Sequence, residues 1–460
     1  MQKDVRAGRA AEAEQFLAAN PEITHISIIV VDNCGVLRGK LLTREELVSV
    51  YRNGRYLPGS FRVLDITGED VPETGMVWED GDADCLALPV PGTLTATTWL
   101  AQPEGQFLST LHELDGTPCI VDPRNALERI VTRFKGLGYN PVAAIELEFY
   151  LVDRDSALAG RPMPPKALLN GARPKHYQAY HLQDLEDFAP FFRDLYTGAK
   201  AQRLPVQTAI SEYAPGQMEI GLMHRADALQ ACDEAIIYKR LVKAVAEKHG
   251  LIATFMAKPY SAWTGSGMHV HVSLAGGDGG NAFATQDPKT HQLLLHAIGG
   301  LKAAMADGMA IFAPNANSYR RFRKNSYAPV APNWGINNRT VSLRVPAGPE
   351  ASTHVEHRVA GADANPYLVL AAVLAGVHHG IERKIDPGPA AEGNAYAQPA
   401  KETIPTNWFA ALERFRASKL MRDYFSDEFV EIFATVKETE ADRFFAEPTE
   451  RDFEWYLRTV

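Results

Sequence analysis

The chain has 460 residues, a hydrophobic fraction of 46% and a formal net charge of -9. A single hydrophobic core stops growing at roughly 250 to 300 residues, so this length predicts two domains. The acidic charge, with no basic run, excludes the electrostatic footprint of a nucleic-acid-binding protein, and we expect small molecules as partners.

The apolar segments and the cysteines exclude further classes. The longest apolar stretch, residues 367–377, is shorter than the about 20 residues that a transmembrane helix needs, so we expect no membrane association. Residues 1–20 lack the apolar core of a secretory signal. Four cysteines without CxxC spacing are typical of reduced thiols that pack in a core. We therefore expect a cytoplasmic protein.

The first quarter of the chain has the pattern of a small sheet domain. Residues 23–31 favour a strand, residues 32–35 (DNCG) a turn, and residues 36–42 the second arm of a hairpin. Residues 43–46 (TREE) form a capping box, which predicts a short helix that ends near Gly54. These elements predict a sheet with a helix across it.

A turn-rich link, residues 115–118 (DGTP), separates this part from the rest, and we place a domain boundary between residues 117 and 118. The apolar run 119–121 predicts a strand, and Asp122 followed by proline predicts a helix that ends near Gly136. Beyond it, strands alternate with helices, which is an α+β pattern. The clearest of these are strands at 142–152 and 267–274 and helices at 226–248 and 366–384.

Acidic residues and histidine recur at two-residue spacing inside otherwise apolar strands. Because side chains of a strand alternate between its faces, residues at this spacing share one face. Two further carboxylates flank a Pro-Gly turn and can converge from its two sides. The positions are Glu146 and Glu148 in AIELEFY, His269, His271 and Ser273 in MHVHVS, Glu356 and Arg358 in VEHR, and Glu212 and Glu219 around the turn.

Each of these pairs, taken alone, also fits the solvated face of an edge strand. Four such segments in one chain favour a common site. Five carboxylates in one cleft repel one another, and a hard divalent cation with oxygen ligands relieves that repulsion. A single histidine among them suits Mg²⁺ or Mn²⁺ in a phosphate-handling site better than structural zinc.

Two arginine-rich segments indicate an anionic ligand. Residues 317–324 (NSYRRFRK) and 338–344 (NRTVSLR) carry planar guanidinium groups suited to carboxylate and phosphate, although a solvated basic loop is the alternative. Carboxylates and arginines without a nucleophile motif indicate phosphoryl transfer. No GxxxxGK[ST] motif occurs, so an ATP site is not a P-loop, and the run 276–280 (GGDGG) predicts a surface turn.

Taken in order, these segments resemble the glutamine synthetase superfamily, and within it the γ-glutamylputrescine (γ-glutamylpolyamine) synthetases. The resemblance covers nearly the whole chain through AIELEFYLVD, ATFMAKPY, GSGMHVHVSL, APNANSYRRF, WGINNRT and HRVAGADANPYL. It implies a small N-terminal β-grasp-like domain (residues 1–117) and a large C-terminal catalytic domain (residues 118–460), whose antiparallel sheet lines the active site. It also implies a homo-oligomer of stacked rings, a dodecamer, with active sites between subunits.

The resemblance further implies a role for each matching residue, with ATP as co-substrate and two or three Mg²⁺ or Mn²⁺ ions per site. Glu148, Glu212 and Glu219 would hold one ion, and Glu146, His269 and Glu356 the second. Thr264, Gly265, Arg321 and Arg358 would contact glutamate, Arg339 and Arg344 the ATP phosphates, and Gln207, His271, Ser273 and His354 the nucleotide. Thr264, His354 and Gln207 replace an asparagine, an arginine and a glutamate of the family pattern.

Two departures from the family concern the acceptor. Ammonia-using members have a glutamate where this chain has Tyr327 and an aspartate where it has Pro58. Ammonium must lose its water and a proton, so its site needs fixed negative groups. A tyrosine phenol is neutral at pH 7, but its ring can line an entrance of hydrocarbon size. We therefore expect an ATP-dependent ligase that joins the γ-carboxylate of L-glutamate to an organic amine through γ-glutamyl phosphate. Putrescine or a polyamine is the favoured acceptor.

Other functions stay open at this point. One is a γ-glutamyl ligase for isopropylamine, ethanolamine or aniline, which differs only in pocket shape. Glutamine synthetase proper and a non-catalytic relative are opposed by the missing acidic residues and by the intact metal ligands, respectively. Asp65, Glu69 and Asp70 follow the loop at residues 57–61 (LPGSF), which contains Pro58. We hypothesise that they bind the distal ammonium of a diamine, with a solvated acidic turn as the alternative.

Overall fold

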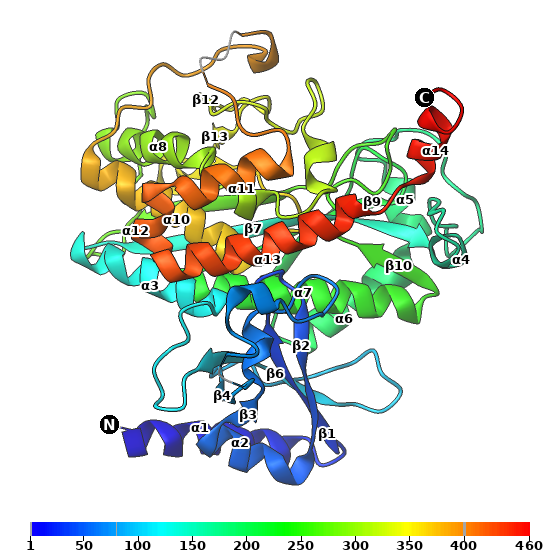
Figure 1. The fold of residues 1–460 in the computed structure, drawn as a ribbon, viewed down its shortest axis with the longest axis vertical. Coiled ribbons are helices and arrows are strands. Elements are labelled where there is room, and N and C mark those ends of the chain that lie inside the picture. The colour runs from blue at the N-terminus through cyan, green and yellow to red at the C-terminus, as the bar shows by residue number, and fades with distance from the viewer. Residues whose placement is uncertain (1, 80, 399–401) are drawn as a thin grey trace.

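The computed structural model describes residues 2–79, 81–398 and 402–460, and it confirms the α+β class. Figure 1 shows a smaller sheet at the bottom, near the N-terminus, and a larger sheet above it that helices surround. The smaller sheet lies within the predicted domain 1–117, whose boundary stays a prediction.

The N-terminal sheet is mixed. Its strands are β1 (His25–Val31), β2 (Leu37–Thr43), β3 (Arg55–Leu57), β4 (Cys85–Pro89), β5 (Thr95–Ala96) and β6 (Gly105–His112). They run in the order β2-β1-β6-β4-β3, with β5 also paired to β6. The β1–β6 pair is parallel and the other pairs are antiparallel, in agreement with a β-grasp-like domain.

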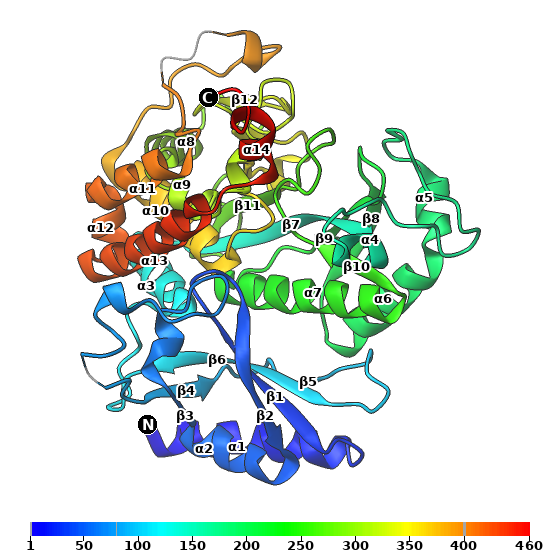
Figure 2. The same cartoon turned by 45° about the vertical axis from the view of Figure 1, so that its right-hand side comes forward.

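The predicted hairpin and the helix that follows it are confirmed. β1 and β2 pair antiparallel on either side of the turn at residues 32–35. The Thr43 backbone N–H donates to Glu46 Oε2 at 2.9 Å, which closes the capping box ahead of α2 (Leu47–Asn53). The helix stops at Gly54, whose φ of +77° favours glycine. Figure 2 shows α2 beside α1 (Gln2–Ala19), below the sheet.

The larger sheet forms the centre of the C-terminal part. Its strands are β7 (Asn140–Asp153), β8 (Val206–Ser211), β9 (Gln217–Leu222), β10 (Leu251–Thr254), β11 (Met268–Ala275), β12 (Trp334–Ile336), β13 (Leu343–Val345) and β14 (Val355–His357). They run in the order β12-β13-β14-β11-β7-β9-β8, with β10 also paired to β7. Every pairing except β12–β13 is antiparallel, and the predicted strands at 142–152 and 267–274 are the neighbours β7 and β11.

Helices pack around this sheet. They are α3 (Pro123–Gly136), α4 (Arg154–Leu158), α5 (Leu182–Asp187), α6 (Ala189–Ala201), α7 (Ala228–Lys248), α8 (Gln292–Met305), α9 (Met309–Phe312), α10 (Pro366–Arg383), α11 (Trp408–Ala417), α12 (Lys419–Phe425), α13 (Asp427–Ala446) and α14 (Glu450–Tyr456). α3 and α7 pack on β7 and lie between the two sheets (Figures 1 and 2). The predicted caps of α3 and α10 are confirmed, because Asp122 and Asn365 each accept a hydrogen bond from the first turn. No helix of the described residues is long and apolar enough to cross a membrane.

The strand predicted at residues 119–121 is wrong. The chain there makes only an isolated bridge at Pro118 and then turns into α3. The reason is the cap, since the Asp122 carboxylate also accepts from the Leu111 backbone N–H at 2.9 Å and thereby holds a turn. The apolar side chains of the run still enter the core, and all four cysteines are buried and unpaired, as expected.

Helices α8 and α10 cross at a contact that glycine permits. A Cβ at Gly300 would lie 2.1 Å from the Gly376 carbonyl oxygen and 2.4 Å from the backbone of Gly380. We predict that Gly300→Ala lowers the free energy of unfolding by about 1–3 kcal/mol, because the two helices must move apart. Chemical denaturation measures this loss. Gly277→Ala, on the exposed turn where an added Cβ meets nothing within 4 Å, is the control, and equal stability of the two variants would contradict the prediction.

Candidate active site

One cavity gathers almost all of the candidate residues. Its volume is about 810 Å³, and it lies over one face of β7, β9, β11 and β14. The predicted residues that line it are Glu146, Glu148, Glu212, Glu219, Thr264, Gly265, His269, His271, Arg321, Tyr327, Arg339, Arg344, His354, Glu356 and Arg358. The segments that the sequence separates by more than 200 residues therefore meet at one place.

Two predicted nucleotide contacts are not among the lining residues. Gln207 is exposed on β8, where the register with β9 shifts between Val206 and Ala209. Ser273 is half-buried and shares a strand face with His271, but it lies farther along β11 than the cavity extends. Their roles toward a nucleotide stay predictions.

Strand register brings the candidate ligands together. Glu146 and Glu148 lie on one face of β7, as their spacing predicts. Across the sheet, Glu146 is opposite His269 of β11, and Glu148 is opposite Glu219 of β9. Strand β14 pairs with the other edge of β11 and places Glu356 opposite His271, two residues along β11 from His269.

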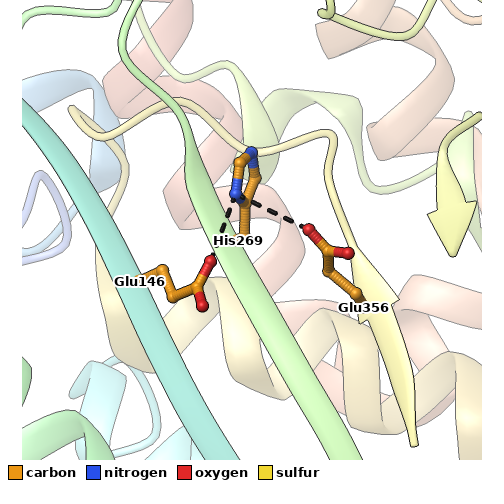
Figure 3. Close-up of side chains that lie close together, drawn as sticks. All are labelled: Glu146, His269 and Glu356. Atoms are coloured by element: carbon orange, nitrogen blue, oxygen red, sulfur yellow. Dashed lines mark ion pairs between the residues drawn. The ribbon is translucent and has the colours of Figure 1, made fainter. Parts of the chain in front are cut away.

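Glu146, His269 and Glu356 point toward one another from three neighbouring strands (Figure 3). The His269 Nδ1 atom lies 3.5 Å from Glu146 Oε2 and 3.7 Å from Glu356 Oε1. One ligand atom from each residue lies within 4.8 Å of the other two, which suits a single bound cation. Burial lowers the pKa of His269 to about 4, so its imidazole is neutral at pH 7 and able to bind a metal ion.

Glu148, Glu219 and His269 form a second group with ligand atoms within 4.8 Å of one another. Glu212, predicted with Glu148 and Glu219, lines the cavity but lies outside this group. Burial and the neighbouring carboxylates raise the pKa of Glu219 to about 9 and that of Glu148 to about 7. A divalent cation relieves this repulsion, so the oxygen-rich donor set fits Mg²⁺ or Mn²⁺.

Glu356 is the carboxylate with the strongest countercharge. Arg344 and Arg358 both donate to its oxygens, the first at 3.0 Å. Burial raises the pKa of Glu356, but the positive charges around it, above all the guanidinium group of Arg358, more than offset this and lower it to about 2. Because both arginines also line the cavity, an incoming phosphate or carboxylate competes with Glu356 for them.

The loop at Thr264 and Gly265 closes against Arg321. A Cβ on Gly265 would lie 2.6 Å from the Ala257 carbonyl oxygen and 2.8 Å from Arg321 Cγ, so a side chain has no room there. Arg321 is buried and donates to the Val359 carbonyl oxygen at 2.7 Å, which holds the guanidinium at the cavity wall.

Gln217 is a cavity residue that the sequence analysis missed. Its Nε2 donates to Glu148 Oε2 at 3.3 Å and to the Gly265 carbonyl oxygen at 3.1 Å, and its Oε1 accepts from Thr264 Oγ1 at 2.5 Å. The sequence feature that could have identified it is its position two residues before Glu219, which puts both side chains on the same strand face. Gln217 therefore positions a candidate metal ligand against the loop that follows β10.

The acidic segment at residues 65–70, which follows the loop that contains Pro58, is held by contacts within the chain. Asp65 has a side-chain exposure of 1% and accepts from Thr67 Oγ1 at 2.7 Å. Arg443 of α13 forms ion pairs with Asp65 and with Glu69, the latter at 2.6 Å. Asp65 therefore stabilises its own turn, while a role of Glu69 and Asp70 toward an amine stays a prediction.

Comparisons with known proteins agree with this geometry. Residues 120–456 match the family described as glutamine synthetase, catalytic domain. The chain is 39% identical to the γ-glutamylputrescine synthetase PuuA of Escherichia coli (strain K12), over 100% of this chain and 97% of that protein. It is 34% identical to the glutamate–isopropylamine ligase of Pseudomonas sp, over 90% of this chain and 91% of that protein.

A solved structure has the same fold. The GmaS/ADP complex superposes with a TM-score of 0.84 at 26% sequence identity, and the match covers 98% of this chain and 99% of that one. The family match over the catalytic part, the full-length relatives and this structure lead to one conclusion: the chain belongs to the glutamine synthetase family.

Proposed function

We propose that this ATP-dependent ligase joins the γ-carboxylate of L-glutamate to putrescine or a related polyamine, through γ-glutamyl phosphate, with release of ADP and phosphate. The observation that carries the acceptor class is the charge of the cavity wall. Among the described residues, every carboxylate that lines the cavity is one of the five glutamates among the six predicted metal ligands, and Tyr327, where ammonia-using members have a glutamate, also lines it. An alkyl amine therefore meets an aromatic ring, whereas ammonium finds no further anion.

The relatives support the same class of acceptor. The protein that is 39% identical over the whole chain carries the name γ-glutamylputrescine synthetase, which favours a diamine. The isopropylamine ligase favours the second candidate, a γ-glutamyl ligase for a small or aromatic monoamine such as isopropylamine, ethanolamine or aniline. Glutamine synthesis from ammonia is opposed by Pro58 and Tyr327. A non-catalytic relative is opposed by the compact metal-ligand groups.

The proposed reaction has two steps. The γ-carboxylate of glutamate attacks the terminal phosphate of ATP and displaces ADP to give γ-glutamyl phosphate, and Arg339 and Arg344 neutralise the charge that develops on the phosphoryl oxygens. Arg321 and Arg358, beside Gly265, bind the substrate carboxylate and hold the nucleophile in line. The amine nitrogen then attacks the acyl carbon, its proton passes to a base, and phosphate leaves.

Two or three Mg²⁺ or Mn²⁺ ions complete the proposed site. When bound, they neutralise the phosphates of ATP and orient them. Glu146, His269 and Glu356 would hold one ion, and Glu148, Glu212 and Glu219 another. We also propose that the chain acts in the cytoplasm as a homo-oligomer of stacked rings, a dodecamer, with its domain boundary between residues 117 and 118.

Phosphate release with glutamate, ATP and Mg²⁺ tests the acceptor. The panel is ammonium, methylamine, isopropylamine, ethanolamine, aniline, putrescine and spermidine. We expect kcat/KM for putrescine or spermidine to exceed that for ammonium about 100-fold, because each missing charged contact to ammonium is worth about 1.5–3 kcal/mol. Mass spectrometry of the product checks the γ-glutamyl bond. The highest kcat/KM with isopropylamine would move the function to the monoamine candidate, and the highest with ammonium to glutamine synthesis.

A further inference from the structure

Tyrosine rings from three separate loops line the same cavity. Tyr180, Tyr213 and Tyr327 all line it, although they are far apart in the sequence. The ring centroids of Tyr213 and Tyr327 are 6.2 Å apart, and Tyr177 contacts Tyr213 edge-on at 5.8 Å. We call Tyr180, Tyr213 and Tyr327 the tyrosine wall.

The tyrosine wall is not part of the hydrophobic core. The three residues keep exposed fractions of 63% (Tyr180), 42% (Tyr213) and 49% (Tyr327). The large fully buried tyrosines of this chain, such as Tyr150 and Tyr238, have exposed fractions of 0%. Rings whose only role is packing are buried in this way, so the exposed faces of the wall are available to a ligand.

Two of the three tyrosines have an uncommon backbone conformation. Tyr180 has a φ of +60° and Tyr327 a φ of +58°, a left-handed conformation that is unfavourable for bulky side chains. Such conformations persist where the surrounding structure holds them, and they cluster at ligand sites. Here the Tyr180 backbone N–H donates to the Ser211 carbonyl oxygen at 2.9 Å, which ties its loop to β8 two residues before Tyr213.

The ring of Tyr177, which contacts Tyr213, is also held in place. The Tyr177 hydroxyl donates to the Ala262 carbonyl oxygen at 2.8 Å, and the rings of Tyr177 and Tyr327 both contact the ring of Tyr213. The position of Tyr213 is therefore set by two neighbouring rings, and it is the central member of the wall.

The wall has the chemistry of a cation site. The face of an aromatic ring carries negative charge and attracts an ammonium group. A carboxylate at this place would also be a ligand for divalent cations and would compete with the acidic groups of the metal site, whereas a ring is not such a ligand. Aromatic faces thus attract an organic cation in a cavity whose carboxylates are all candidate metal ligands.

We propose that the tyrosine wall is a subsite that binds the distal ammonium group of a diamine or polyamine, while its other nitrogen reacts. This inference rests on the proposed function and adds to it the recognition of the acceptor's second charge. Tyr213 is its central specificity-determining residue. Ammonium and simple monoamines have no second cation, so they gain nothing from the wall.

The test compares putrescine with n-pentylamine, in which a methyl group replaces the distal ammonium group. We expect kcat/KM of the wild-type enzyme to favour putrescine about 5- to 30-fold, and Tyr213→Leu to reduce this preference about 3- to 10-fold. Tyr213→Phe, which keeps the ring, is the matched control and should preserve the preference. Tyr180→Leu, made in the wild-type background, should also reduce the preference for putrescine.

A second series isolates the charge of the ring from its shape. Position 213 receives phenylalanine carrying none, one, two or three ring fluorines, each of which makes the ring face less negative. The putrescine preference should fall stepwise along the series. An unchanged preference across the series, or in Tyr213→Leu, would overturn the subsite.

The wild-type enzyme separates the two proposals. Equal use of putrescine and n-pentylamine would overturn the tyrosine wall as a cation subsite and leave the glutamate–amine ligase standing. Failure to use either amine, with phosphate release only on addition of ammonium or not at all, would overturn the proposed acceptor and the subsite together.

Discussion

Replacing His269 by alanine is expected to lower amine-dependent phosphate release about a thousandfold, because a metal site supplies several kcal/mol of transition-state stabilisation. His269 is the residue to change, since it belongs to both groups of candidate ligands. Without its neutral imidazole, Glu146 and Glu356 on one side and Glu148 and Glu219 on the other lose their shared ligand. Steady-state phosphate release at saturating Mg²⁺ measures the effect.

The control for this prediction is His224→Ala, at an exposed position outside the cavity. A direct readout is Mn²⁺ binding followed by electron paramagnetic resonance, which should weaken in the His269 variant while its circular dichroism spectrum stays that of the wild type. A variant that kept a tenth or more of the wild-type rate would show that His269 holds no ion needed for turnover.

The second large effect is on stability, at a buried ion pair within α13 that contacts the N-terminal part of the chain. Lys437 of α13 has a side-chain exposure of 0% and donates to Glu440 at 2.9 Å and to Cys34 Sγ at 3.1 Å. Glu440 in turn accepts from the Ile66 backbone N–H at 2.9 Å. The pair therefore fastens α13 to the turn after β1 and to the loop that carries Asp65.

Lys437→Met should lower the free energy of unfolding by about 3–5 kcal/mol, because it leaves the Glu440 carboxylate buried without its cation. Urea denaturation at fixed protein concentration measures the loss, and Lys419→Met, at an exposed position of α12, is the control. Lys437→Met combined with Glu440→Leu should recover most of the stability, since apolar residues of similar volume can replace a buried pair. A single variant as stable as the wild type would show that the pair is dispensable.

Charge, more than shape, defines the site. Five carboxylates and four arginines line one cavity, and the pKa values of Glu148 and Glu219 are raised while that of Glu356 is lowered. The difference has a physical cause: Glu356 is beside two arginines, whereas the other two face carboxylates. Glu148 and Glu219 therefore have the most to gain from a divalent cation.

Much of the site was predictable from local patterns. The two-residue spacing of Glu146 and Glu148 in an apolar run predicts one strand face, because alternation is a property of any extended chain. The capping residues Asp122 and Asn365 predict where α3 and α10 begin, because the first turn of a helix needs acceptors for its N–H groups. Asp122 also shows the limit of prediction from local patterns. Its carboxylate accepts a second hydrogen bond, from the distant Leu111 backbone N–H, and the chain forms a turn where a strand was expected.

The sequence by itself determined which side chains are candidates for the chemistry and which of them share a strand face, and it shows Pro58 and Tyr327 at the positions where ammonia-using members have acidic residues. Only the tertiary structure decided that β9 pairs with β7, so that Glu219 is opposite Glu148, and that Tyr180 and Tyr213 reach the wall of Tyr327. The reason is the range of the interactions. Alternation and capping act between residues a few positions apart, whereas strand partners and loop positions are selected by burial of a core assembled from the whole chain.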